Sequence, residues 1–232
     1  MRLKIYTLAL IPVILFQGYA VKKNTPRLAE PEGERIGQKD VGKSLALLIL
    51  GDSAAAGVGV NVQDDALLGA ILKELSSEFS IQFYLHAMTG FTTDQVIQSI
   101  QTLETQHFDV IITSVGVNDI TKFTSPQAWI AKQKQLYQIL KHKFSPQLTI
   151  ASGVPPMDQF PALPNPLAWL FGQYAKAMNL ELGQFVAQQK QIPSSSVPKM
   201  CGNSFSPASI CACSASLYWK GPKFCAPLTI SA

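Results

Sequence analysis

Three short segments of this sequence present a hydroxyl, a glycine and a carboxamide in chain order. The first holds Asp52 and Ser53, the second Gly90, and the third Asn118 and Asp119. A serine hydroxyl at a strand end can act as a nucleophile when backbone amides, such as that of the glycine, hold the developing oxyanion. A neutral carboxamide suits the same task because it donates without titrating, and an adjacent Asp can support the loop through backbone hydrogen bonds. These residue types indicate a serine nucleophile with an oxyanion site.

Each segment also has a plainer interpretation when it is taken alone. Gly51-Asp52-Ser53 is compatible with a simple turn, Gly90 with an ordinary turn glycine, and Asn118-Asp119 with another turn. The small residues AAAGVGV after Ser53 favour chemistry, because they let substrate and backbone approach closely. The chemical interpretation therefore depends on the three segments meeting at one end of one sheet.

Hydrophobic patterning predicts the elements that carry these segments. Continuous apolar or β-branched runs, typical of buried parallel strands, cover residues 44–50, 80–87, 109–115 and 148–154. Apolar residues at helical spacing predict helices over 66–75, 96–103 and 167–189. A further helix begins at Ser125-Pro126, where a capping residue precedes proline at the first helical position.

Alternating strands and helices predict a parallel sheet with helices on both faces. In such a sheet the ligand site lies at the carboxyl ends of the strands. Ser53, Gly90 and Asn118 each follow the end of a predicted strand. We therefore expect all three at the same edge of the sheet.

Composition limits the classes of protein that fit. The chain has 232 residues, of which 47% are hydrophobic and 15% charged. It is apolar enough for a core and too poor in charge to be disordered throughout. The net charge of +4 is spread over isolated Lys and Arg residues, which disfavours nucleic-acid binding. The sequence contains no dinucleotide-binding glycine motif, and it predicts no particular oligomeric state.

The N-terminal residues 1–20 have an apolar run behind two basic residues. Their cleavage signal is poor, so an uncleaved signal-anchor is preferred over a signal peptide, although the apolar run is short for a membrane span. The polar, Pro- and Gly-containing residues 21–43 are predicted to be a linker that holds the domain off the membrane. The predicted location is the bacterial inner membrane with the domain in the periplasm, or secretion if residues 1–20 are removed.

The three segments together resemble the SGNH (GDSL) hydrolases. LLILGDSAAAGVGV resembles the first block of that family, with Ser53 as nucleophile. Gly90 falls where the second block supplies an oxyanion amide, and GVNDIT resembles the third block, with Asn118 as the side-chain donor. SGVPPMDQFPALP resembles a substrate-loop segment of bacterial esterases in this family. The resemblance covers about residues 45–190.

This resemblance implies an α/β fold of the three-layer α/β/α, flavodoxin-like kind, here over residues 44–190 and preceded by a hydrophobic helix. It also implies hydrolysis of small acyl esters or lipids through an acyl-enzyme, with no cofactor and no metal. The N–H groups of Ser53 and Gly90 and the Asn118 side chain would hold the oxyanion. Asp52 and Asp119 would support the loops.

The C-terminal region departs from the family, whose last block is an Asp and a His three positions apart. From Pro193 to Ala232 the sequence has no Asp, Glu or His, and residues 191–232 are predicted to be irregular. All four cysteines lie in this region, where disulfides are a more natural interpretation than a zinc site. They are Cys201, Cys211, Cys213 and Cys225.

Three explanations of this departure are open. The preferred one is a shifted reading frame, because a required motif is lost, the composition changes abruptly and cysteines cluster. The second is a pseudo-hydrolase, a membrane-tethered module that binds without turnover. The third is another histidine as base: His86 ends a predicted strand, His107 precedes one at the wrong end of the sheet, and His142 lies late in a helix.

Without a base the chain is predicted to have little esterase activity, a loss on the order of 10⁴–10⁶ in rate. Several large apolar residues fall in or near the loops of the expected active edge. They are candidates for an acyl pocket, and equally for ordinary core. These residues are Phe91, Phe123, Met157, Phe160 and Trp169.

Overall fold

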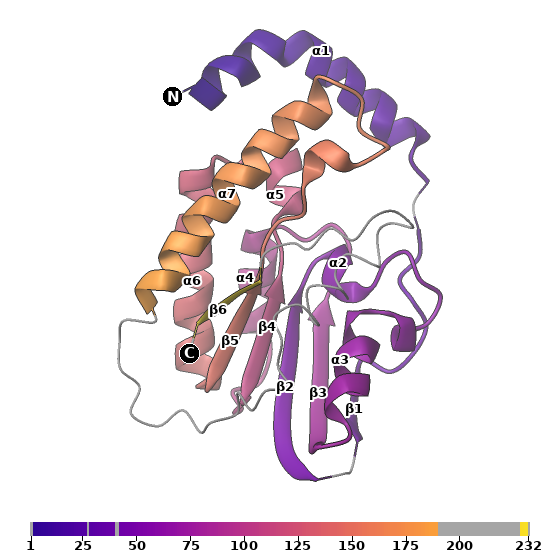
Figure 1. Cartoon of the computed structure of the whole chain (residues 1–232), viewed down its shortest axis with the longest axis vertical. Helices are drawn as coiled ribbons and strands as arrows, with labels where there is room; N and C mark the ends of the chain where they lie inside the picture. Colours follow the sequence, from indigo (N-terminus) through magenta and orange to yellow (C-terminus); the bar gives the residue numbers. More distant parts are fainter. Residues whose placement is uncertain (1, 27, 40–41, 190–227, 232) are drawn as a thin grey trace.

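A six-stranded sheet with the strand order β1-β3-β2-β4-β5-β6 forms the centre of the computed structural model (Figure 1). The structure describes residues 2–26, 28–39, 42–189 and 228–231. The strands are β1 (Ile36–Lys39), β2 (Lys43–Gly51), β3 (Phe79–Ala87), β4 (Val110–Ser114), β5 (Leu148–Ser152) and β6 (Leu228–Ser231). The α-helices are α1 (Arg2–Asn24), α2 (Ser53–Ala56), α3 (Leu67–Leu75), α4 (Thr93–Gln101), α5 (Val117–Thr121), α6 (Pro126–Phe144) and α7 (Leu167–Gln189), with 3-10 turns η1 (Gln63–Asp65) and η2 (Met157–Gln159).

The four strands predicted from apolar runs are present, and they are parallel to one another. β2 lies between β3 and β4, so the chain moves from β2 to β3 on one side and then crosses to β4 on the other. This is the flavodoxin-like order, in which the chain changes direction across the sheet at the first parallel strand, here β2. In sheets of this kind ligands bind outside the carboxyl ends of the two strands at the reversal, which here are β2 and β4.

The two edge strands are antiparallel to their neighbours: β1 pairs with β3, and β6 pairs with β5. β1 belongs to the segment predicted as a linker, and β6 to the region predicted as irregular. Three of the four β1 residues are exposed, and β1 is too short to show an alternating pattern. The sequence predicts a parallel sheet, but the structure has a mixed sheet whose four central strands are parallel and whose two edge strands are antiparallel.

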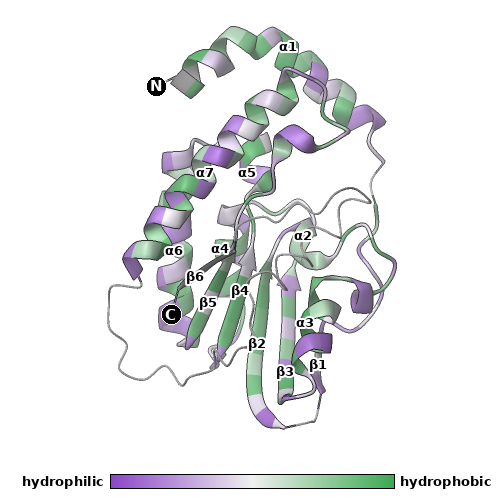
Figure 2. Cartoon of the chain, viewed as in Figure 1, coloured by the Kyte–Doolittle hydropathy of each residue, from purple (hydrophilic) through white to green (hydrophobic). Residues whose placement is uncertain are grey.

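Both faces of the sheet are covered by helices, which gives the expected three layers. On one face, alternate residues of β2 and β3 pack with α2 and α3 in a cluster that includes Ile49, Ile81 and Leu68. On the other face, α4 and α6 pack on a cluster that includes Leu48, Ile100 and Leu136. Figure 2 shows the central strands coloured mainly as hydrophobic, as their continuous apolar runs require.

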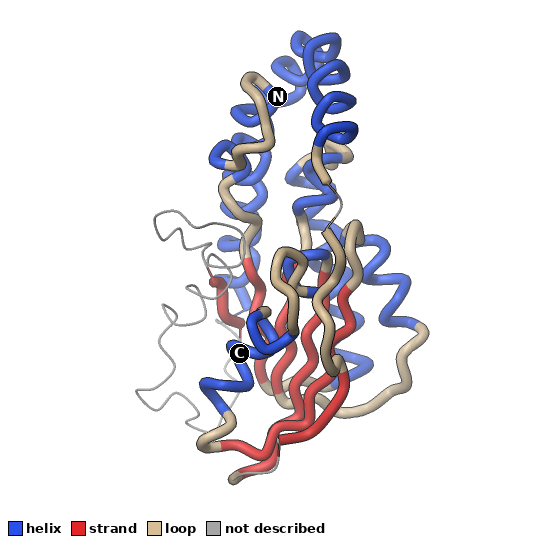
Figure 3. Tube along the Cα trace, turned by 90° about the vertical axis from the view of Figure 1, so that its right-hand side faces the viewer, coloured by secondary structure: helices blue, strands red, loops and turns tan. Residues whose placement is uncertain are grey.

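A third cluster lies at one end of the molecule, where helices continue beyond the sheet (Figure 3). It joins α5, α6 and α7 to the segment that follows β5, and α1 adds Ile14. The start of α6 is as predicted, because the Ser125 side chain accepts from Ala128 N–H and Pro126 follows it. α4 likewise begins at Thr92, in a capping box with Gln95.

Candidate active site

The carboxyl end of β2 places Ser53 between two neighbouring strands. Gly51, its last residue, is aligned with Ala87 of β3 and Ser114 of β4. The Asp52 N–H donates to the Ser114 carbonyl at 3.1 Å, so the strand continues directly into the turn that carries Ser53. A Cβ on Gly51 would lie 2.0 Å from the Ser114 oxygen, so only glycine permits this approach. Ser53 begins α2 and is half-buried.

Asp52 caps the short helix that Ser53 begins. Its Oδ1 accepts from the Ala54 N–H at 2.9 Å, and the residue is only 1% exposed. Burial raises the pKa of Asp52 to about 6, and the nearby Asp119 carboxylate acts in the same direction. Asp52 therefore holds the Ser53 turn by hydrogen bonding from inside the protein.

Gly90 lies in a tight turn that follows β3. The turn is closed by a hydrogen bond from Phe91 N–H to the Met88 carbonyl, and Met88 N–H donates to the carbonyl of Gly51. Gly90 is the third residue of the turn and has φ 88°, a left-handed value that favours glycine. Gly90 is exposed, and no atom lies within 4 Å of the position that a Cβ would take. The turn is thus joined directly to the strand that precedes Ser53.

Asn118 connects the third loop to the second. It lies in α5 and is half-buried, and its Nδ2 donates to the Phe91 carbonyl at 2.9 Å. A carboxamide nitrogen carries two hydrogens, so this contact fixes the side chain and leaves a second N–H to donate. The segments of Ser53, Gly90 and Asn118 therefore converge at one edge of the sheet, joined through backbone contacts of Gly51 and Phe91.

Asp119 links the Asn118 helix to the start of α4. The residue is fully buried, and its Oδ2 accepts from both the N–H and the hydroxyl of Thr93, each at 2.9 Å. Gln133 of α6 donates to the same hydroxyl at 3.1 Å, and Lys132 Nζ lies 4.0 Å from Asp119 Oδ1. Burial raises the pKa of Asp119, although the hydrogen bonds from Thr93 oppose this rise.

Two residues that the sequence does not single out hold the Gly90 turn from the other side. Glu30 Oε1 accepts from the N–H and hydroxyl of Thr89 at 2.8 and 2.6 Å. Arg35 Nη1 contacts Glu30 Oε2 at 2.7 Å, and Arg35 also donates to the carbonyl of Ala87. Partial burial opposes ionisation of Glu30, but the hydrogen bonds from Thr89 and Arg35 outweigh it and lower its pKa. Both charged residues lie in the segment predicted as a linker.

The candidate pocket residues separate into different environments. Met157 is buried in the end cluster, and Phe123 and Phe160 pack partly buried against it. Phe123 has φ 55° and packs against Phe171, with ring centres 5.6 Å apart. The remaining two lie elsewhere: Phe91 packs partly buried against the cluster that contains Ile100 of α4, and Trp169 is 39% exposed, its ring edge-to-face with Tyr6 of α1.

The histidines differ in their relation to this edge. His86 lies in β3 one residue before its end, half-buried, and its pKa is lowered by burial and by the charge of Arg35. His107 precedes β4 at the opposite end of the sheet, 3.1 Å from Asp109. His142 is exposed near the end of α6. The four cysteines lie outside the described residues, and the residues that are described contain no cluster of potential metal ligands.

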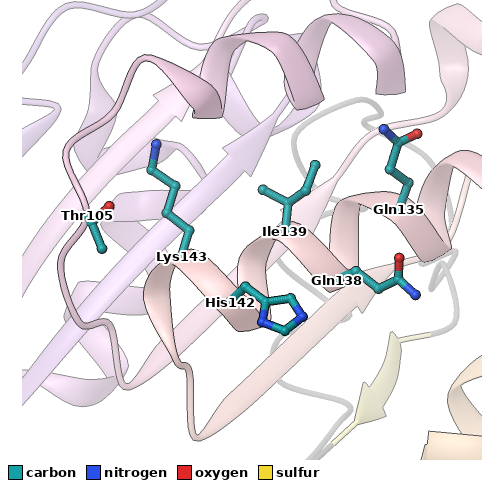
Figure 4. A pocket seen from close by; sticks show the side chains of 6 residues that line it. All are labelled: Thr105, Gln135, Gln138, Ile139, His142 and Lys143. Atoms are coloured by element: carbon teal, nitrogen blue, oxygen red, sulfur yellow. The ribbon is translucent and has the colours of Figure 1, made fainter.

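Two surface pockets lie away from the Ser53 edge. The first is formed by the second half of α6 and the loop before β4 (Figure 4). All its lining residues except Ile139 are polar or charged, and His142 is one of the side chains that surround it. The second lies over β1, β3 and the same loop. Neither pocket includes Ser53, Gly90 or Asn118.

Comparisons with solved structures find several proteins that are similar to this chain. A lipolytic protein of the G-D-S-L family from Veillonella parvula is similar, with 16% identity, a TM-score of 0.49, and coverage of 62% of this chain and 73% of that one. The SGNH-hydrolase family esterase AlinE4 shows 20% identity, a TM-score of 0.48, and coverage of 65% and 74%. Axe2, an acetylxylan esterase from Geobacillus stearothermophilus, shows 14% identity, a TM-score of 0.45, and coverage of 62% and 74%.

No curated protein sequence matches the chain. The family whose profile matches is described as the GDSL-like Lipase/Acylhydrolase family, over residues 49–208. That range includes the segments of Ser53, Gly90 and Asn118, together with β2 from Ile49 onward. The match extends over more than half of the sequence, and so this chain belongs to the GDSL-like lipase/acylhydrolase family.

Proposed function

We propose that the chain is a serine ester hydrolase in which Ser53 attacks the acyl carbonyl of a small ester or lipid. The family supports ester hydrolysis in general. The observation that carries the specific proposal is the convergence of three loops. Asp52 N–H bonds to the end of β4, Met88 N–H to the end of β2, and Asn118 Nδ2 to Phe91.

In this mechanism the Ser53 hydroxyl oxygen forms a bond to the carbonyl carbon, and the carbonyl oxygen becomes an oxyanion. The N–H groups of Ser53 and Gly90 and the second N–H of the Asn118 amide donate to that oxygen. The alcohol leaves with a proton, and water then attacks the acyl-enzyme to release the acid and regenerate Ser53. Asp52 and Asp119 act only through position, because their carboxylates accept from Ala54 and Thr93.

The proposal includes impaired turnover. A general base must take the proton from Ser53, and residues 193–232 contain no Asp, Glu or His that could supply the last family block. Loss of such a base leaves oxyanion stabilisation and binding, at a cost on the order of 10⁴–10⁶ in rate. A shifted reading frame beyond Gln189 explains both the missing pair and the cysteine-rich composition. The DNA in all three frames tests this explanation, because an intact Asp-x-x-His in another frame supports it.

The N-terminal helix supports attachment to a membrane. Within the described residues, one stretch is long and apolar enough to cross a bilayer, Ile5–Asn24 of α1, and a signal sequence would show the same property. We place the protein at the bacterial inner membrane, attached through uncleaved residues 1–20, with the domain in the periplasm. If residues 1–20 are cleaved, the domain is secreted.

A fluorophosphonate probe tests the proposal, because it reacts faster the more strongly a serine is activated. Because the base is missing, we expect slow labelling of Ser53 on the full chain, abolished by Ser53→Ala and retained by Ser77→Ala at an exposed serine. Hydrolysis of p-nitrophenyl butyrate should be close to the rate without protein. Silence of the probe would show that Ser53 is not activated, and would fit either a non-catalytic membrane-tethered binding module or an enzyme that the missing Asp and His have inactivated.

A further inference from the structure

One side of α1 is seated on the domain along its whole length. The inward residues follow one another at spacings of three and four, which places them on a single helix face. They pack against the cluster formed by α5, α6, α7 and the segment after β5, and Ile14 at their centre is only 4% exposed. The inward apolar residues are Leu3, Leu10, Ile14 and Val21, with Thr7 and Gln17 between them.

The two polar side chains on this face have partners in the domain. Gln17 Nε2 donates to the Asn165 carbonyl at 2.7 Å, and its Oε1 accepts from Leu167 N–H at 3.2 Å. The Thr7 hydroxyl lies 3.1 Å from the Tyr174 hydroxyl. Such groups are costly in hydrocarbon unless they are hydrogen-bonded. A freely spanning α1 would keep the bond from the Thr7 hydroxyl to the Leu3 carbonyl of its own helix at 2.9 Å, but Gln17 would lose both its partners. A docked α1 keeps all these contacts.

The opposite side of α1 is exposed and apolar. Leu8 is 67% exposed, Phe16 75% and Tyr19 68%, and Figure 2 shows most of the helix in the hydrophobic colour. α1 contains no acidic residue, and its last turn carries Lys22 and Lys23. An apolar face with cations and a Tyr at its end fits an anionic bilayer, where rings and lysines lie at the headgroups.

α1 also lies at the end of the molecule where chemistry is proposed. In Figure 1 it crosses the end toward which the arrows of β2 and β4 point. Its inward residues share one cluster with Val117 and Ile120, which flank Asn118. Phe160 and Leu163 fill the same cluster, so apolar contacts run continuously from α1 to the Asn118 helix.

We infer that α1 is a membrane-contact helix that remains docked on the domain and lies along the surface of an anionic bilayer, rather than a free tether that spans it. The Ser53 edge then faces the bilayer, and the substrate class is an acyl ester presented at a lipid surface. The substrate part rests on the proposed function; the docking part stands on the contacts of α1 alone.

Flotation with vesicles tests the contact face. The full chain, with an intact N-terminus confirmed by mass, is mixed with phosphatidylcholine vesicles with and without phosphatidylglycerol. We expect co-flotation, stronger with the anionic lipid, and a loss of about tenfold or more in Leu8→Asp and Phe16→Asp. The matched control Leu180→Asp, at a leucine of α7 that is 63% exposed, should float as the wild type does. Equal flotation of all three variants, or a chain that forms dimers and ignores vesicles, would overturn the inference.

Two further measurements separate docking from spanning. In a spanning helix an N-terminal epitope is protected inside the vesicle, whereas a helix lying on the surface leaves it open to added protease. Gln17→Leu should speed hydrogen exchange at the Leu167 amide several-fold. Gln127→Leu, at an exposed glutamine of α6, should leave that exchange rate unchanged. Epitope protection, or unchanged exchange in Gln17→Leu, would contradict docking. Labelling of Ser53 by a soluble fluorophosphonate tests the hydrolase proposal separately. If the hydrolase proposal fails, the flotation and exchange experiments still test the docking of α1, and the reverse is also true.

Discussion

Two carboxylates hold the proposed active edge from opposite sides, and they do so with the same chemistry. Asp119 accepts from the N–H and hydroxyl of Thr93, and Glu30 accepts from the N–H and hydroxyl of Thr89. Asp119 is fully buried and lies 4.0 Å from Lys132, whereas the Glu30 side chain is 29% exposed. Burial of Asp119 raises its pKa, and the hydrogen bonds to Glu30 lower its pKa.

The difference shows that equal hydrogen-bond geometry does not imply an equal contribution to stability. Removing a buried carboxylate leaves its hydrogen-bond donors unpaired where water cannot reach them. At the surface, water can take the place of the lost carboxylate. We therefore expect the Asp119–Thr93 contact to determine folding, and the Glu30–Thr89 contact to determine the position of the Gly90 turn.

The largest expected effect is that of Asp119→Ala. It leaves the Thr93 N–H and hydroxyl without their acceptor inside the core and should lower the free energy of unfolding by about 3 kcal/mol. Asp119→Asn retains one acceptor oxygen and should cost less. Urea denaturation followed by circular dichroism measures both variants. A loss below 1 kcal/mol in Asp119→Ala would show that burial does not distinguish the two contacts.

A second buried carboxylate, Asp52, sharpens the contrast through pH. Its pKa is raised from 3.8 to about 6, which corresponds to about 3 kcal/mol between the two protonation states. Because the folded-state pKa is the higher one, the contribution of Asp52 is complete below pH 3.8 and is lost as the pH rises through 6.

The stability of wild type minus that of Asp52→Asn should therefore fall between pH 4 and pH 7 by on the order of 2 kcal/mol. The asparagine keeps an oxygen for the Ala54 N–H, so the cap of α2 is preserved. Urea midpoints at several pH values supply the measurement. A difference that does not vary with pH would mean that water reaches Asp52.

The contacts that the sequence predicts best are those that local pattern determines. The apolar runs that predict strands over residues 44–50 and 148–154 correspond to β2 and β5, because a buried parallel strand needs continuous apolar residues. Ser125-Pro126 marks the start of α6 for an equally local reason. Strand ends then place Ser53 and Asn118 at one edge without any knowledge of long-range contacts.

The contacts that the sequence does not predict join residues that are distant along the chain. Glu30 lies 59 positions from Thr89, and nothing in a polar segment distinguishes a paired carboxylate from a solvated one. Gln17 meets Asn165 across 148 positions. Apolar residues are spread around the whole of α1, so its docked face leaves no periodic signal. The antiparallel strand β1 is short and mostly exposed, and it shows no alternation.

The smallest expected effect on stability is that of Glu30→Ala, at about 1 kcal/mol or less, because the residue is partly exposed. Its effect on the rate at which Ser53 is labelled should be more marked than its effect on stability. Without Glu30 the Thr89 N–H is released and the Gly90 turn loosens, so fluorophosphonate labelling of Ser53 should slow several-fold. Glu34→Ala, at an exposed glutamate in the same segment, is the matched control.

The pH dependence of Glu30 should have the opposite sign to that of Asp52. Since its folded-state pKa lies below the usual 4.5, its contribution is present above that pH and is lost as the pH falls through the folded-state value. The stability difference between wild type and Glu30→Gln should thus shrink on acidification, whereas the difference for Asp52→Asn grows. Two differences that move in the same direction would show that burial does not separate the two carboxylates. In that case the slower labelling in Glu30→Ala would need a cause other than the Glu30–Thr89 contact.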